Sequence, residues 1–323
     1  MNLINQKYNK VFIVFVKTLV VALSFWFLYT EIRKEYFNLQ FSQIQQYVYI
    51  NPRIDLFLLV FVLSVLNLLL DVYKWHYAIR FLSPIPFISS IKSVLTGMSI
   101  GLLTPNSIGE FIGRILHLKD SDKAKGTVIY FIVSLSQLAI TIMAACLCSL
   151  YYFYFVQPLS TINYLLIASA GLSIALIVLF LVYRFDRIIK LLSKSAFLKN
   201  RIHVLDVYSI YSIKDLSLFL FISLIKYICF TSQYILMYYL LGFDGSVITL
   251  FSVLSLIFIS QSILPVFSLF DVGVKGSLAL LFLKPIGIGV SAILFTTFSI
   301  WMLNVILPSV IGLFLFINAK YTK

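Results

Sequence analysis

Long apolar windows recur along this chain and constrain its fold more than any other feature. Several of them reach the roughly 20 apolar residues that cross a hydrocarbon core about 30 Å thick. Backbone groups inside lipid must bond within their own segment, so these windows must be helices. Of the 323 residues, 61% are hydrophobic and 11% charged, against roughly 25% charged in a soluble domain. The sequence therefore predicts an all-α, polytopic integral membrane protein, with one domain over residues 1–323 and no soluble catalytic domain.

The net charge and the cysteines indicate which kinds of partner and ligand the protein binds. The formal net charge is +13, but the basic residues lie in short loops between apolar windows, which favours anionic phospholipid over nucleic acid as the partner. Cys146, Cys148 and Cys229 lie within apolar stretches without ligand spacing or a histidine nearby. We expect packing cysteines, no metal and no cofactor.

Six windows read as full membrane spans. The first follows Lys7 and Lys10 and has no small-residue cleavage site after it, so it is a retained span and not a signal peptide. The predicted spans are Val11–Tyr29, Ile54–Ile79, Thr127–Phe155, Tyr164–Tyr183, Leu216–Leu241 and Ile286–Ile317.

Two further apolar stretches, Phe87–Leu118 and Val247–Leu283, are interrupted at Pro105 and Pro265. Each predicts two helices of about 12 to 17 residues, which reach mid-membrane and return as a re-entrant hairpin. The distribution of basic loops then places both termini in the cytoplasm and the protein in the cell's inner (cytoplasmic) membrane, with the hairpins inverted relative to each other. Residues Asp186–Val204 carry apolar and basic faces typical of an interfacial helix.

The two breaks share a pattern. Ser-x-x-acid follows each proline, as Ser107 to Glu110 and Ser268 to Asp271, and predicts a capping box at a helix start. A base follows each acid by four residues, which predicts two ion pairs. In an inverted repeat, broken helices of this kind point their positive ends to the bilayer midplane, where an anionic headgroup could bind. Candidate headgroup residues are Arg114, Glu110, Ser107, Asn106, Lys275, Asp271, Ser268, Lys92 and Arg80; the expected break residues are Pro105, Gly109, Gly113, Pro265 and Gly273.

A purely structural interpretation stays open, in which the serines and acids only satisfy helix starts and the pairs only neutralise charge. Other polar residues have ordinary explanations. Asp71 and Lys74 can pair with each other, Lys17 and Lys226 can snorkel, and intramembrane amides hold helices together; these amides are Asn67, Gln137, Gln233 and Gln261.

Three motifs stand out in the sequence: Lys74-Trp75 with Arg80, the run from Gly101 to Glu110 with Arg114, and Leu264-Pro265 through Gly273-Val274-Lys275-Gly276. Together they resemble the transmembrane region of lysylphosphatidylglycerol synthases, a flippase-like family. Gly276 stands where the family usually has a glutamate, and only Gly109 remains of a glycine pair. The resemblance implies movement of a phospholipid or polyprenyl-linked lipid between leaflets. Because the chain ends at Lys323, synthesis of aminoacylated lipid is not expected.

Three functions therefore compete. The first is an ATP-independent translocase for an anionic phospholipid, an aminoacyl-phospholipid or a polyprenyl-phosphate lipid, since no nucleotide motif appears. The second is a secondary transporter of a small solute. The third, an enzyme acting on lipid headgroups through Glu110 or Asp271, has least support because no histidine lies near either acid in sequence. A homodimer and a separately encoded lipid-modifying enzyme stay open as partners.

Overall fold

The computed structural model describes residues 53–104, 107–184, 206–264 and 270–318, together with Trp26, Tyr29, Thr30, Arg33 and Arg187. Regular structure in this part of the chain is entirely helical, which confirms the prediction of an all-α protein. Four helical stretches are long and apolar enough to cross a membrane, at Ile54–Ile79, Asp120–Val156, Thr161–Tyr183 and Val290–Ile317. They contain α3 (Ile54–Ile79), α6 (Lys123–Tyr151), α7 (Thr161–Tyr183), α13 (Val290–Trp301) and α14 (Leu307–Asn318).

A fifth long helix, α10 (Ile213–Leu240), has 28 residues, and many of its side chains are buried. Helices therefore occupy five of the six predicted spans. The predicted first span, Val11–Tyr29, and the predicted interfacial helix, Asp186–Val204, lie almost wholly outside the described residues, so the count of six stays a prediction.

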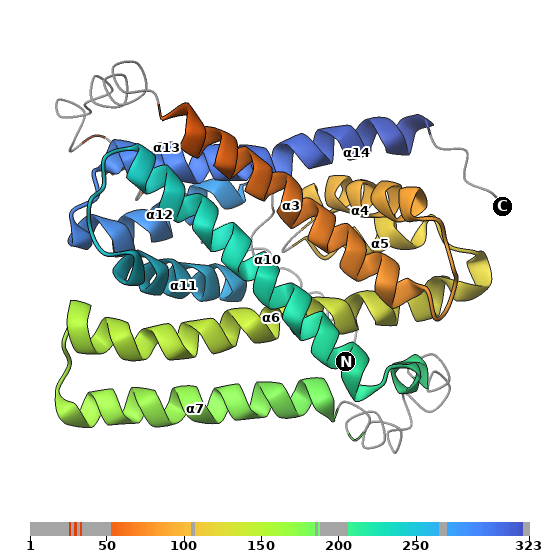
Figure 1. Ribbon diagram of the computed structural model, residues 1–323, viewed down its shortest axis with the longest axis horizontal. Helices are drawn as coiled ribbons and strands as arrows, with labels where there is room; N and C mark the ends of the chain where they lie inside the picture. Colours follow the sequence, from red (N-terminus) through yellow and green to blue (C-terminus); the bar gives the residue numbers. More distant parts are fainter. Residues whose placement is uncertain are drawn as a thin grey trace, which may run out of the picture.

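The shorter helices form two hairpins at opposite ends of the molecule (Figure 1). One consists of α4 (Phe87–Leu102) and α5 (Glu110–Ile115), and the other of α11 (Val247–Ile263) and α12 (Asp271–Leu283). In Figure 1, α3 and α10 run diagonally across the front, α13 and α14 follow one side, and α6 and α7 follow the other. Helix α4 packs on α5 and α14, whereas α11 packs on α6 and α12. The long helices thus surround the region toward which both hairpins point.

The last predicted span is one helical stretch with a change of register. A π-helical segment, Met302–Ile306, joins α13 to α14, and Pro308 follows it without a backbone N–H to continue the α-helical ladder. Asn304 in this segment accepts a hydrogen bond from Asn67 at 3.2 Å and donates one to Gln233 at 2.6 Å. Two of the predicted intramembrane amides therefore connect α3, α10 and this segment, as expected of amides in a helix bundle.

Two predictions about the hairpins were wrong. Helix α5 has only 6 residues, whereas α4, α11 and α12 have 16, 17 and 13. Residues 103–109 are not helical in their described part, and the Gly109 N–H donates to Thr104 Oγ1 at 2.8 Å, so the turn uses residues that were expected in the helix. The predicted capping box of Ser107 and Glu110 also fails, because the N-cap of α5 is Gly109, without a side-chain cap. Ser268 of the second predicted box lies outside the described residues.

Candidate functional site

An ionic cluster joins the first hairpin to two long helices. Arg114 Nη2 on α5 lies 3.1 Å from Glu110 Oε2 and 2.6 Å from Asp71 Oδ2 on α3. Asp71 also accepts from Lys226 Nζ of α10, with 2.6 Å between Nζ and Oδ1. The predicted pair of Glu110 and Arg114 is confirmed. The pairing of Asp71 with Lys74 and the snorkelling of Lys226 were wrong, because the crossing of α3, α5 and α10 brings partners together that are distant in sequence.

Lys74 lies one turn from Asp71 and is only 2% exposed. Its Nζ donates to Ser223 Oγ at 2.8 Å and lies 3.4 Å from Ser136 Oγ. Both hydroxyls donate to carbonyls of their own helices, so their lone pairs are directed to the lysine. Arg114 and Lys226 share the carboxylates of Asp71 and Glu110, and Lys74 lies one turn from Asp71, so basic groups outnumber acidic ones in this cluster.

Glycines allow α5 to lie directly against α4. A Cβ on Gly113 would be 2.5 Å from the Gly97 Cα, and a Cβ on Gly101 would be 2.5 Å from Glu110 Cγ. Ser93 Oγ of α4 also donates to the Arg114 carbonyl at 2.6 Å. These contacts fix α5 and so place the Glu110 and Arg114 side chains at the inner side of the hairpin.

The second hairpin carries a simpler site. Lys275 Nζ lies 2.6 Å from Asp271 Oδ2, which confirms the second predicted ion pair. The two side chains are 15% and 26% exposed, whereas Arg114 is 4% exposed. Gly273, which lies between these two residues in the sequence, is buried. The other expected break and headgroup residues of the two tips, Pro105, Asn106, Pro265 and Ser268, lie outside the described residues.

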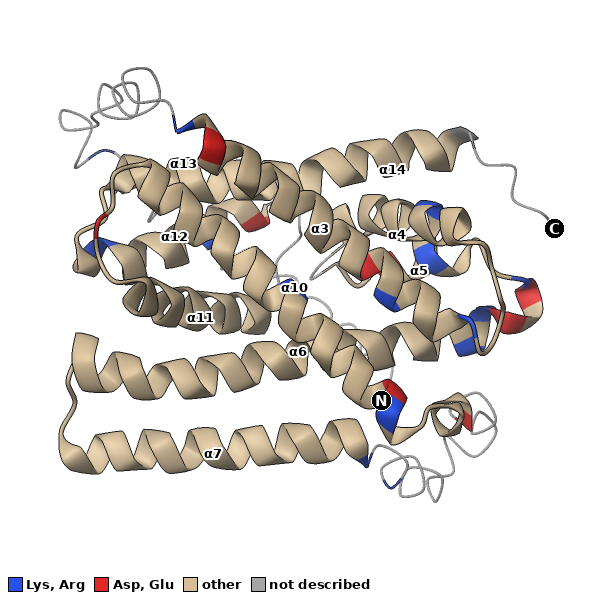
Figure 2. Ribbon diagram, in the orientation of Figure 1, with Lys and Arg blue, Asp and Glu red and all other residues tan. Residues whose placement is uncertain are grey.

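Two adjoining cavities connect the hairpins. One of about 440 Å³ is lined by Asp271 and Lys275, and the other, of about 400 Å³, by the ionic cluster around Arg114. Figure 2 shows the charged positions as isolated coloured segments on the otherwise tan helices α3, α5 and α12. The cavities have five lining residues in common, Ser107, Gln137, Thr141, Lys226 and Ser262. The structure therefore brings both predicted ion pairs to one polar space, with Lys226 in both parts.

Three buried polar atoms around this space have no hydrogen-bond partner in the described part of the chain. They are Asn67 Oδ1, Gln137 Oε1 and Arg114 Nε. Since a buried polar group without a partner costs roughly 1–3 kcal/mol, each of these atoms is a place for ordered water or a polar ligand.

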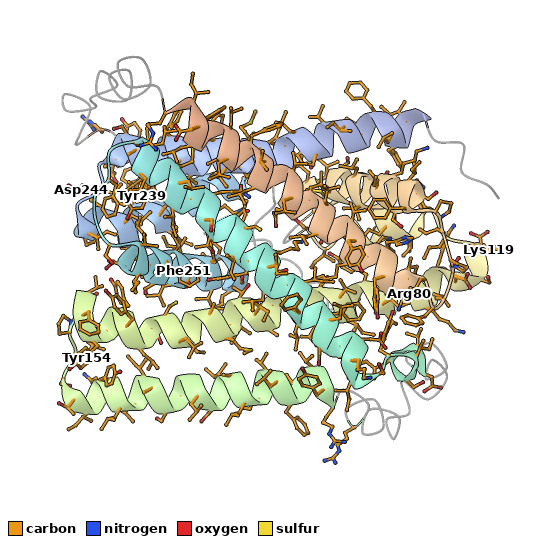
Figure 3. The ribbon with its side chains drawn as sticks, in the orientation of Figure 1. Arg80, Lys119, Tyr154, Tyr239, Asp244 and Phe251 are labelled. Carbon is orange, nitrogen blue, oxygen red and sulfur yellow. The ribbon has the colours of Figure 1, made fainter. Side chains whose placement is uncertain are left out.

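Two of the expected headgroup residues lie elsewhere. The Arg80 guanidinium stacks on the Tyr77 ring, 3.7 Å from its centroid, and Figure 3 shows Arg80 at the same end of the molecule as Lys119. Lys92 is exposed on α4. Neither residue lines the two cavities. Conversely, sequence reasoning missed Asp71, Lys74, Lys226 and Gln137 as site residues, although an ionisable residue within an apolar helix is itself a signal of function.

Within the described ranges, no group of three or more His, Cys, Asp or Glu side chains could hold a metal ion.

Comparison with known proteins gives one positive result. No curated protein and no solved structure matches the chain. The family described as the lysylphosphatidylglycerol synthase TM region matches residues 14–319, nearly the whole length. This match shows that the chain belongs to the lysylphosphatidylglycerol synthase transmembrane-region family.

Proposed function

We propose that this protein moves an anionic lipid between membrane leaflets by passing the headgroup through the polar space between the two hairpins. The observation that carries this proposal is the sharing of Lys226 and Gln137 by cavities that reach the ion pairs of both hairpins. A headgroup bound at either hairpin then has a continuous polar path to the other.

The charges in this path suit a phosphate. Bases outnumber acids around it, and a lipid phosphate bonds most strongly to charged donors such as the ammonium and guanidinium groups of Lys226, Lys275 and Arg114. Ionisable groups at membrane depth are costly, which favours a function in transport for this cluster over a purely structural one.

The proposed orientation follows the basic residues. Arg80 and Lys119 lie at one end of the molecule, and Tyr154 and Asp244 at the opposite end (Figure 3). By the positive-inside rule the first end faces the cytoplasm, so the hairpin of α4 and α5 enters from the cytoplasm and the hairpin of α11 and α12 from the other side. We propose this inverted, re-entrant arrangement in the inner membrane, with both termini cytoplasmic.

The proposal is for transport and not for catalysis. The carboxylates nearest the path, Asp71, Glu110 and Asp271, are all engaged in ion pairs with bases. A carboxylate that acts as a general acid or base must approach the substrate, whereas each of these is occupied by a basic side chain of the protein.

Leaflet exchange in proteoliposomes tests the function. The purified chain is reconstituted with a fluorescent anionic phospholipid in one arm, a fluorescent zwitterionic phospholipid in a second, and trapped inorganic phosphate in a third. We expect protein-dependent exchange of the anionic lipid, lost in Lys226→Gln. No exchange of any anionic phospholipid or polyprenyl phosphate would refute the proposal, and efflux of trapped phosphate alone would identify a small-solute transporter.

A further inference from the structure

An apolar groove lies beside the polar space. It has a volume of about 480 Å³, which is within the usual range for small-molecule sites. Helix α6 forms one wall, and the opposite wall comes from Val182 at the end of α7, Tyr208, and the first turns of α10. The lining includes Val128, Phe131, Ser134 and Leu138 of α6 and Leu216 and Phe219 of α10.

The groove and the polar space meet at two residues. Ser134 and Leu138 line both the groove and the cavity that contains Arg114 and Glu110. One turn of α6 therefore forms the boundary between a strongly polar compartment and an apolar one. A ligand that fills both must be amphipathic, with its charged group next to its hydrocarbon part.

The groove is open to the outside of the molecule along α6. Phe131 is 49% exposed and Leu138 is 40% exposed. Helix α7 lies alongside α6 (Figure 1), and most of its side chains are exposed. In a bilayer, apolar side chains exposed in this way face lipid tails.

We propose that this groove binds an acyl chain of the lipid whose headgroup occupies the polar space. This inference rests on the proposed function and adds the site by which lipid enters it, laterally along the exposed side of α6, with the chain in the groove and the phosphate beyond Ser134. Recognition then depends on the hydrocarbon chain as well as on charge, so a phosphate compound without a chain is a poor ligand.

A photoreactive lipid tests the inference. The whole protein in bilayer nanodiscs is irradiated with an anionic phospholipid that carries a diazirine on its acyl chain, and the labelled peptides are mapped. We expect labelling of residues 128–138, and loss of most of it in Val128→Trp, because an indole fills the groove. Leu147→Trp is the matched control, because Leu147 is 68% exposed on the same helix and does not line the groove; its labelling pattern should equal that of the wild type.

A second measurement needs only the wild-type chain. A water-soluble short-chain phospholipid with the same headgroup should compete with the photoreactive lipid far less well than its long-chain counterpart. Equal competition by both, or labelling that Val128→Trp leaves unchanged, overturns the inference. So does a cysteine cross-link that places residues 11–29 of the same chain in the groove. If any of these contrary results appears while the protein still exchanges anionic lipid between leaflets, the acyl-chain groove is refuted and the proposed function stands. If the groove is labelled as expected but no lipid exchange occurs, the proposed function is refuted and the groove remains a lipid-binding site.

Discussion

Each hairpin carries an acid and, four residues later, a base, yet the surroundings of the two pairs differ. Arg114 of the first hairpin is shared between Glu110 and Asp71, is almost fully buried, and belongs to a cluster that also contains Lys226. Lys275 of the second hairpin has only Asp271 as an ion-pair partner in the described part of the chain, and both side chains are partly exposed in the cavity.

This difference suggests a division of roles. A buried base with two carboxylate partners is held firmly, and removing one partner leaves an uncompensated charge. A partly exposed base with one partner can exchange it for a phosphate at lower cost. We therefore expect the first hairpin to fix the architecture and the second to exchange ligands.

The largest expected effect is on stability, from Asp71→Asn. The substitution removes the carboxylate between Arg114 and Lys226 and leaves both bases crowded together, at a cost of about 3–5 kcal/mol. Thermal unfolding in detergent should show a large fall in Tm. Asp55→Asn is the control, because the Arg53–Asp55 pair is exposed on both sides and should leave Tm unchanged. Similar Tm values for the two variants would show that the ionic cluster around Arg114 does not stabilise the fold.

Gly113→Ala should have the next largest effect. The new Cβ would meet backbone atoms of α4 at 2.5–2.6 Å, and backbone cannot yield as a side chain end can, so the cost is roughly 1–3 kcal/mol or more. Gly171→Ala is the matched control, because Gly171 is also within a helix and a Cβ there meets no atom closer than 3.5 Å. A lower Tm for Gly113→Ala alone is expected, and equal Tm values would mean that the hairpin arms separate readily.

Transport should distinguish the hairpins more sharply than stability does. We expect Lys275→Gln to lose most anionic-lipid exchange while its Tm stays near that of the wild type, and Arg114→Gln to lose both. Lys92→Gln, at an exposed position outside the cavities, should keep both. Leaflet exchange and Tm measured on the same preparations test this, and normal exchange in Lys275→Gln would contradict the division of roles.

The sequence predicted features that depend on one segment of the chain, and it missed contacts between residues far apart in the sequence. Apolar length predicted the positions of the described long helices, and i,i+4 spacing predicted both local ion pairs, because each depends on one segment only. The Asp71–Arg114 and Asp71–Lys226 contacts join residues 43 and 155 positions apart and exist only because α3, α5 and α10 cross. The short α5 could not be foreseen either, because the Thr104 to Gly109 hydrogen bond uses a turn geometry that competes with the capping box.

The smallest and most specific expected effect comes from Asp271→Asn. If Lys275 must leave Asp271 to bind a phosphate, then removing that carboxylate removes a competitor, and the affinity for anionic lipid should rise a few-fold. Exchange of a zwitterionic lipid should not gain equally, since its headgroup brings its own positive charge. The first hairpin offers no equivalent gain, because Arg114 would keep one carboxylate after loss of either partner. Equilibrium binding of fluorescent anionic and zwitterionic lipids to Asp271→Asn measures this, and weaker anionic binding would show that Asp271 positions Lys275 for the ligand instead of competing with it.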